Sequence, residues 1–164
     1  MPTPSHSRLS LRLKKGADRR LRAGHLWVYS NEVDISATPL KTMLAGSEVV
    51  VEDAGGKFVG MAVVNPASLI CGRLYSHEAH RGLDQTLIAE RLQQALQLRE
   101  RCFSKPYYRA IFGDSDLLPG LVVDRFGDYL SAQLTTAAMD QQRDQVIAAL
   151  DKVFSPKGIV FRNQ

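Results

Sequence analysis

Residues 46–66 read GSEVVVEDAGGKFVGMAVVNP and predict a β-hairpin. β-rich runs at 49–51 and 58–64 flank a turn in which Gly55 and Gly56 can supply a positive φ. Other short β-rich segments surround the hairpin, at residues 8–15, 27–33 and 69–76. Several short strands at close spacing predict a small barrel-like β module.

The hydrophobic period changes after this module. Apolar residues recur at helical spacing beyond residue 83, with Asp84 available as the N-cap: Leu87, Ile88, Leu92, Ala95, Leu96 and Phe103. Residues 107–136 read as strands separated by Gly, Asp and Pro turns, 137–154 as an amphipathic helix, and 156–164 as a further strand. We therefore expect a mixed α/β (α+β) chain whose second module is a small strand-strand-helix-strand domain.

The predicted boundaries divide the chain into four parts. They are a polar arm at 1–8, the β module at 9–76, a linker and helix at 77–104, and the α+β domain at 105–164. The final GIVFRNQ stops while still strand-like, which predicts that the chain is the front part of something longer.

Composition indicates an ordinary globular protein, with 45% hydrophobic and 23% charged residues among 164. Neither an apolar leader nor a membrane-length apolar run is present, so we expect a cytoplasmic protein with no membrane partner. Cys71 and Cys102 lack partners at zinc-ligand spacing and lie in apolar-patterned segments, which predicts two buried free thiols.

The net charge of +4 is unevenly distributed, because residues 1–31 carry seven Lys or Arg against Asp18 alone. Residues 13–33, LKKGADRRLRAGHLWVYSNEV, contain a short helix-capable segment with Gly24 placed to end it. A face of this kind can bind phosphates, although most charge runs are solvated surfaces. The candidate RNA-binding residues are Lys14, Lys15, Arg19, Arg20, Arg22 and His25.

The aromatic residues beside this stretch have two interpretations. Alternation places Trp27 and Tyr29 on one strand face and Val28 on the other. The two rings can stack on unpaired bases, but a lone tryptophan in a small β module is more often part of the core. We favour the core for Trp27.

Four aspartates at positions 114, 116, 124 and 128 raise the possibility of a divalent metal site used for hydrolysis. The surrounding GDSDLLPG and RFGDY are also typical of turns between strands, and we favour turns. The sequence has no G-x-G-x-x-G loop between a strand and a helix, no P-loop and no G-x-S-x-G motif. We therefore expect no catalytic residue, metal or cofactor site in these residues.

Four segments together resemble a known family. They are residues 13–33, GKFVGMAVVNPASLICGRLYS, LRERCF and FGDSDLLPGLVVDRFGDYLSAQ, which in this order resemble the ribosomal RNA large-subunit cytosine-C5 methyltransferases. The resemblance implies a PUA-like RNA-binding domain at 9–76 and a middle domain from about residue 84. It also implies a Rossmann-like methyltransferase domain that lies outside this chain.

The same resemblance implies the partners and the cofactor. Large-subunit ribosomal RNA is the expected partner, together with the protein's own C-terminal methyltransferase domain. S-adenosylmethionine is the expected cofactor of the full-length protein, and the family's catalytic cysteine is not among these residues. The alternative is a stand-alone, non-enzymatic PUA-type RNA-binding adaptor.

Overall fold

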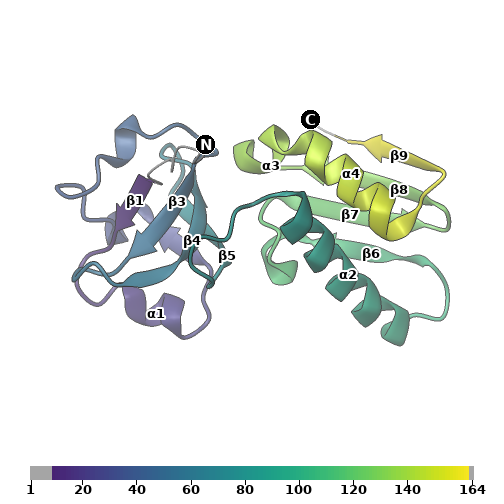
Figure 1. The fold of residues 1–164 in the computed structure, drawn as a ribbon, viewed down its shortest axis with the longest axis horizontal. Coiled ribbons are helices and arrows are strands. Elements are labelled where there is room, and N and C mark those ends of the chain that lie inside the picture. The colour runs from purple at the N-terminus through teal and green to yellow at the C-terminus, as the bar shows by residue number, and fades with distance from the viewer. Residues whose placement is uncertain (1–8, 163–164) are drawn as a thin grey trace, which may run out of the picture. The chain divides into compact units, whose positions relative to one another are not determined.

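The computed structural model describes residues 9–162, so the predicted arm at 1–8 lies outside the described residues. The chain divides into two compact units, Met1–Arg81 and Gly82–Gln164 (Figure 1). Each unit has its own sheet.

The first unit is built around a five-stranded sheet in the order β1-β3-β4-β5-β2. Its elements are β1 (Leu9–Arg12), α1 (Asp18–Arg22), β2 (Trp27–Tyr29), the 3-10 helices Ser30–Glu32 and Leu40–Thr42, β3 (Glu48–Glu52), β4 (Phe58–Val64) and β5 (Ile70–Ser76). β1 runs parallel to β3, and the other neighbouring pairs are antiparallel.

The predicted hairpin is formed by β3 and β4, whose runs match the two β-rich segments. Asp53 fixes the turn, because its side chain accepts hydrogen bonds from the backbone N–H groups of Gly55 and Lys57, both at 2.9 Å. Gly56 takes the positive φ, at +87°. A side chain at φ in this region is strained, which explains why a glycine stands there.

The two edges of this sheet meet at the end of β1. Leu13 and Val33 form an antiparallel bridge, Lys14 N–H donates to the Glu32 carbonyl at 2.8 Å, and Asp34 N–H donates to the Arg12 carbonyl at 2.9 Å. Closure removes free sheet edges and encloses a core. That core includes Leu11, Leu13, Leu21, Val28, Val33, Val49, Val51, Val64, Cys71 and Leu74.

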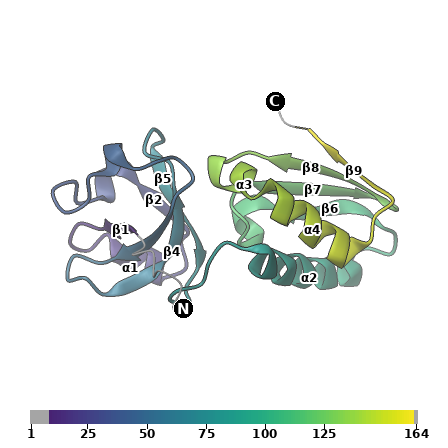
Figure 2. The same cartoon turned by 45° about the horizontal axis from the view of Figure 1, so that its top comes forward.

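The second unit is a four-stranded sheet in the order β6-β7-β8-β9, with helices on one face (Figure 2). Its elements are α2 (Gln85–Cys102), β6 (Tyr107–Phe112), the 3-10 helix Gly113–Asp116, β7 (Leu121–Phe126), β8 (Tyr129–Leu134), α3 (Ala137–Gln141), α4 (Arg143–Phe154) and β9 (Gly158–Phe161). β8 and β9 are parallel, and α3 and α4 connect them.

The expected mixed α/β class is confirmed, and the second unit differs from expectation in detail. Three strands, rather than two, lie between α2 and α3. The single helix expected at 137–154 is divided at Gln142, which ends α3 and begins α4. α2 begins as predicted, because the Asp84 side chain accepts a hydrogen bond from Leu87 N–H at 2.9 Å.

Candidate nucleic-acid interface

The basic stretch folds into one turn of helix between two glycines. Gly16 and Gly24 have φ of +83° and +106°. Leu21 is the buried residue of α1 and is fully shielded from solvent. The helix ends with two backbone bonds, from Gly24 N–H to the Leu21 carbonyl at 3.0 Å and from His25 N–H to the Arg20 carbonyl at 3.1 Å. This Schellman arrangement satisfies the last carbonyls and fixes where the flanking cations emerge.

The Arg20 side chain is bonded to other groups of the first unit. Its Nη2 donates to both carboxylate oxygens of Glu32, at 2.8 and 3.0 Å, and to the carbonyl of Trp27 at 3.2 Å. Its guanidinium carbon lies 5.1 Å from the ring centroid of Tyr29. Arg20 therefore joins α1 to the segment after β2, and its charge is already neutralised.

Arg22 is also engaged within the unit. It donates to Asp18 at 2.8 Å, to Asp53 at 2.9 Å and to the carbonyl of Phe58 at 3.3 Å. The pKa of Arg22 is raised, mainly by its hydrogen bond to Asp18. Arg22 thus ties α1 to the β3–β4 hairpin.

The other four predicted residues behave differently. Lys14, Lys15, Arg19 and His25 are exposed, and among residues 9–162 their side chains have no hydrogen-bond or ion-pair partner. All four lie between the end of β1 and the start of β2. These side chains are free to meet an anion without breaking an existing ion pair. We call these four residues the basic cluster.

Trp27 does not belong to the core. Its side chain is 38% exposed, whereas Val28 is fully buried on the other face of β2. The guanidinium carbon of Arg73 lies 5.4 Å from the ring centroid of Trp27, because β2 and β5 place these residues in register. The expectation of a core tryptophan is wrong, because Trp27 lies on the face of β2 that is open to solvent. Arg73 was missed because only the strand pairing brings it here.

The aspartates proposed for a metal site are held by cations and turns. Asp116 pairs with Arg99, Asp124 with Arg109, and Asp128 with Lys157. Asp114 and Asp116 precede β7 and Asp128 follows it, so they lie at opposite ends of a strand. Within the described residues, no group of three His, Cys, Asp or Glu side chains has a metal-binding arrangement.

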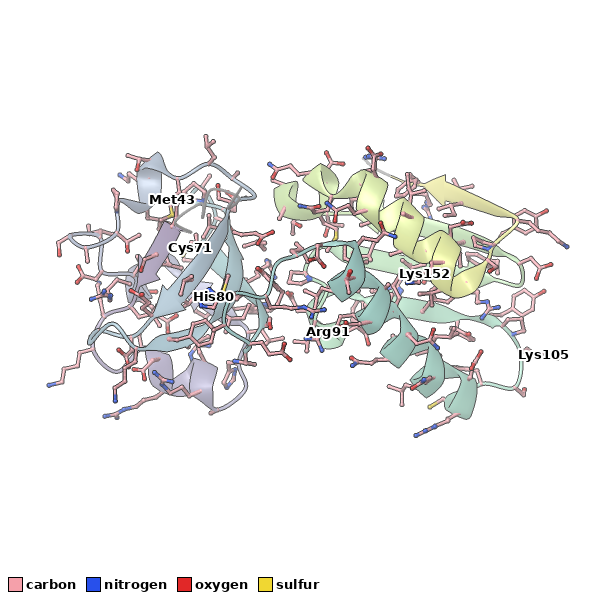
Figure 3. All side chains as sticks on the ribbon, viewed as in Figure 1. Met43, Cys71, His80, Arg91, Lys105 and Lys152 are labelled. Carbon is pink, nitrogen blue, oxygen red and sulfur yellow. The ribbon has the colours of Figure 1, made fainter. Side chains whose placement is uncertain are left out.

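The two cysteines differ. Cys71 is buried in β5 (Figure 3), and burial raises its pKa to about 11. Cys102 is exposed at the last position of α2, so the expectation of a second buried thiol is wrong. Helical periodicity places Cys102 on the face of buried Ala95, but the helix has by then run past the core, because residues 100–107 are all exposed.

An open hollow of about 580 Å³ also lies in the first unit, with Ile35, Leu40 and Leu69 in its lining. None of the six predicted residues lines it. Loops distant in sequence form it, and no local motif marks either loop. In the part of the chain that the structure describes, no helix has the length and apolarity needed to cross a bilayer.

The first unit matches a known domain family. Residues 11–77 match a PUA-like domain family. The chain is 34% identical over 157 residues to "Ribosomal RNA large subunit methyltransferase I" of Cronobacter sakazakii, covering 92% of this chain and 38% of that protein. The protein of the same name from Escherichia coli K12 is 34% identical over 154 residues, with the same coverage.

Solved structures share the fold. A Streptococcus mutans protein described as a SAM-dependent methyltransferase superposes with a TM-score of 0.79 at 21% identity, over 94% of this chain and 40% of that chain. A second solved structure, described as a methyltransferase complexed with SAH, gives a TM-score of 0.80 at 20% identity, over 95% of this chain and 40% of that chain. The chain is therefore homologous to the N-terminal portion of the large-subunit ribosomal RNA methyltransferases, and the resemblance seen in its sequence is confirmed. It spans 38% of the length of these curated relatives.

Proposed function

We propose that the first unit binds large-subunit ribosomal RNA through its phosphates, using Lys14, Lys15, Arg19 and His25. This proposal rests on a contrast within residues 13–33. Arg20 and Arg22 form ion pairs inside the first unit, whereas the side chains of the basic cluster are exposed and unpaired. Exposed cations on a fixed turn release counterions when they meet phosphates, which favours binding to a polyanion. Such contacts position an RNA without reading its sequence.

In this proposal the chain is the RNA-binding and bracing part of an S-adenosylmethionine-dependent cytosine-C5 methyltransferase. The names of the relatives supply the RNA and the reaction class. In this proposal methyl transfer and the binding of S-adenosylmethionine belong to a further domain, because the chain spans 38% of the length of its relatives. The buried Cys71 thiol, with its raised pKa, is unsuited to attack a base.

The test is a salt-dependent titration with a labelled fragment of large-subunit ribosomal RNA. The double variant Lys15→Glu/Arg19→Glu is compared with Lys41→Glu/Lys152→Glu, which makes the same charge change at exposed residues that do not belong to the basic cluster. We expect the first variant to bind at least tenfold more weakly and to lose about one unit of salt slope per lost phosphate contact. The control should lose much less. Equal weakening in both variants would mean that only net charge matters, and the assignment of the basic cluster would fall.

A further inference from the structure

The sheet of the second unit has one face without helices. α2 and α4 cover the other face, where Tyr108, Leu121, Val123, Leu130 and Ala132 are buried (Figure 2). Because side chains alternate along a strand, the residues between these point away from the helices. The helix-free face is therefore made by the alternate positions of β6, β7, β8 and β9.

Three aromatic residues form a row across this open face. Tyr107 on β6 pairs with Phe126 on β7, and Phe126 pairs with Tyr129 on β8. Their side chains are 63%, 56% and 56% exposed. Neighbouring strands lie about 4.8 Å apart, so these three residues occupy adjacent positions across the face. We call Tyr107, Phe126 and Tyr129 the aromatic row.

Two of these aromatic side chains lie close to a glycine. Gly158 is the register partner of Tyr129, and a Cβ on it would lie 3.3 Å from Cδ1 of the Tyr129 ring. A Cβ on Gly127 would lie 3.3 Å from the Tyr107 hydroxyl. These rings therefore pack against bare backbone on one side and keep large exposed areas. An open hollow of about 610 Å³ is lined by the aromatic row and by Lys105, Pro106, Gly127 and Asp128.

The charges around the aromatic row are suited to binding a polyanion with modest affinity. Lys105, Arg109 and Lys157 stand on this side of the unit with Asp124 and Asp128, giving three cations against two acids. Lys105 lies in the loop before β6 (Figure 3), is exposed, and has no side-chain partner among residues 9–162. It is the cation best placed to meet a phosphate beside the rings.

The second row of the face is charged and polar at Arg109, Asp124 and Ser131, and two exposed apolar residues, Phe112 and Val160, lie on the same face. Arg109 and Asp124 form an ion pair in the second row, and Ser131 pairs in register with Asp124. Covering this polar row with protein would remove a charged pair from water, which costs more than the pair returns. Aromatic rings on adjacent strands of a four-stranded sheet, beside cations, are instead the arrangement that stacks unpaired bases.

We propose that the aromatic row binds unpaired bases of single-stranded RNA, with the rings stacking on bases and Lys105 contacting a backbone phosphate. This site is separate from the basic cluster of the first unit and does not depend on it. Stacking tolerates any base, so the site holds an unpaired strand without selecting its sequence.

The test uses the whole chain and a labelled twelve-nucleotide oligouridine carrying 5-iodouridine. The variant Tyr107→Leu/Tyr129→Leu keeps apolar side chains and removes two rings, and Phe103→Leu is the control, because Phe103 is an exposed aromatic outside the row. We expect the double variant to bind at least about tenfold more weakly and the control to bind as wild type. Circular dichroism verifies folding, and the single variant Tyr107→Leu replaces the double if the latter is unfolded.

Photocrosslinking gives an independent readout, repeated in the Lys15→Glu/Arg19→Glu background. Crosslinks at Tyr107, Phe126 or Tyr129 in both backgrounds support the proposal, even if the basic cluster proves unimportant. Crosslinks confined to residues 9–81, or equal affinities for the double variant and the control, overturn it. Analytical ultracentrifugation tests whether this face instead binds a second copy of the chain. A wild-type dimer that is lost in the double variant would make the face a contact between copies and would also overturn the proposal.

Discussion

Arg20 and Glu32 are joined by two hydrogen bonds from one guanidinium nitrogen, at 2.8 and 3.0 Å, across twelve residues of chain. Glu32 also accepts a hydrogen bond from Tyr29 N–H at 2.9 Å, so the carboxylate holds α1 and the end of β2 together. The pair lies where the barrel closes, next to the bridge between Leu13 and Val33. Arg20, which the sequence offers as a candidate RNA contact, therefore also links two parts of the fold.

Replacing Arg20 should weaken the first unit more than replacing its neighbour. We expect Arg20→Ala to lower the free energy of unfolding by about 1–2 kcal/mol, because Glu32 loses a charged partner. Arg19→Ala, at an exposed residue without a partner, should change it by less than about 0.5 kcal/mol. Urea unfolding followed by the fluorescence of Trp27, the single tryptophan, measures both. Equal effects of the two changes would contradict this role of Arg20.

Local patterns in the sequence predicted the elements well. The β3–β4 hairpin and α2 follow from residues within one turn or one helix period, such as Gly56 and Asp84. The short helix and its end at Gly24 also follow from neighbouring residues. Contacts of this range are visible in a sequence because the partners are adjacent in it.

The contacts of the basic residues could not be predicted from the sequence, because they are not local. Arg22 meets Asp53 across 31 residues, and Arg99 meets Asp116 across 17. Nothing in the sequence distinguishes these arginines from the unpaired Arg19. The aromatic row was missed for the same reason, since the register of three strands is needed to align it. The alternation of Tyr107 with buried Tyr108, and of Tyr129 with buried Leu130, was the available signal.

Asp116 should be essential to the second unit. Its carboxylate accepts two hydrogen bonds from Arg99, both at 2.8 Å, and one from Phe112 N–H at 2.7 Å. The two side chains are only 15% and 10% exposed. Removing the carboxylate leaves a largely buried guanidinium unpaired, so we expect Asp116→Ala to cost about 3 kcal/mol.

Hydrogen exchange with mass spectrometry checks this prediction. Amides of β6, including that of Phe112, should exchange faster in Asp116→Ala. The control is Asp144→Ala, which removes an exposed carboxylate from the first turn of α4. Unchanged protection of β6 in Asp116→Ala would show that the pair adds nothing to stability.

The β3–β4 turn should make the first unit sensitive to acid. The pKa of Asp53 is lowered in the folded chain, first by the hydrogen bond from Lys57 N–H and also by Gly55 N–H and Arg22. A lowered folded pKa means that the stabilisation is present above the ordinary value of 3.8 and is lost as the pH falls through the folded value.

Unfolding of the wild type should therefore become easier as the pH drops below about 4. Asp53→Asn keeps an oxygen that can accept the two backbone bonds and cannot be protonated in this range. We expect this variant to be less stable at neutral pH and to show a flatter acid limb in urea titrations followed by Trp27. If the stability of Asp53→Asn fell with decreasing pH as steeply as that of the wild type, the acid sensitivity would arise from other carboxylates.

The two cysteines should differ sharply in reactivity. A thiol reacts as its thiolate, and burial both raises the pKa of Cys71 to about 11 and blocks access to its sulfur. Cys102 is exposed at the end of α2. We expect iodoacetamide at pH 8 to label Cys102 in the folded protein and Cys71 only after unfolding. Peptide mass spectrometry distinguishes the two sites, and Cys102→Ser should abolish labelling of the folded chain. Rapid labelling of Cys71 in that variant, under conditions where Trp27 fluorescence shows the first unit to be folded, would mean that the barrel opens readily around β5.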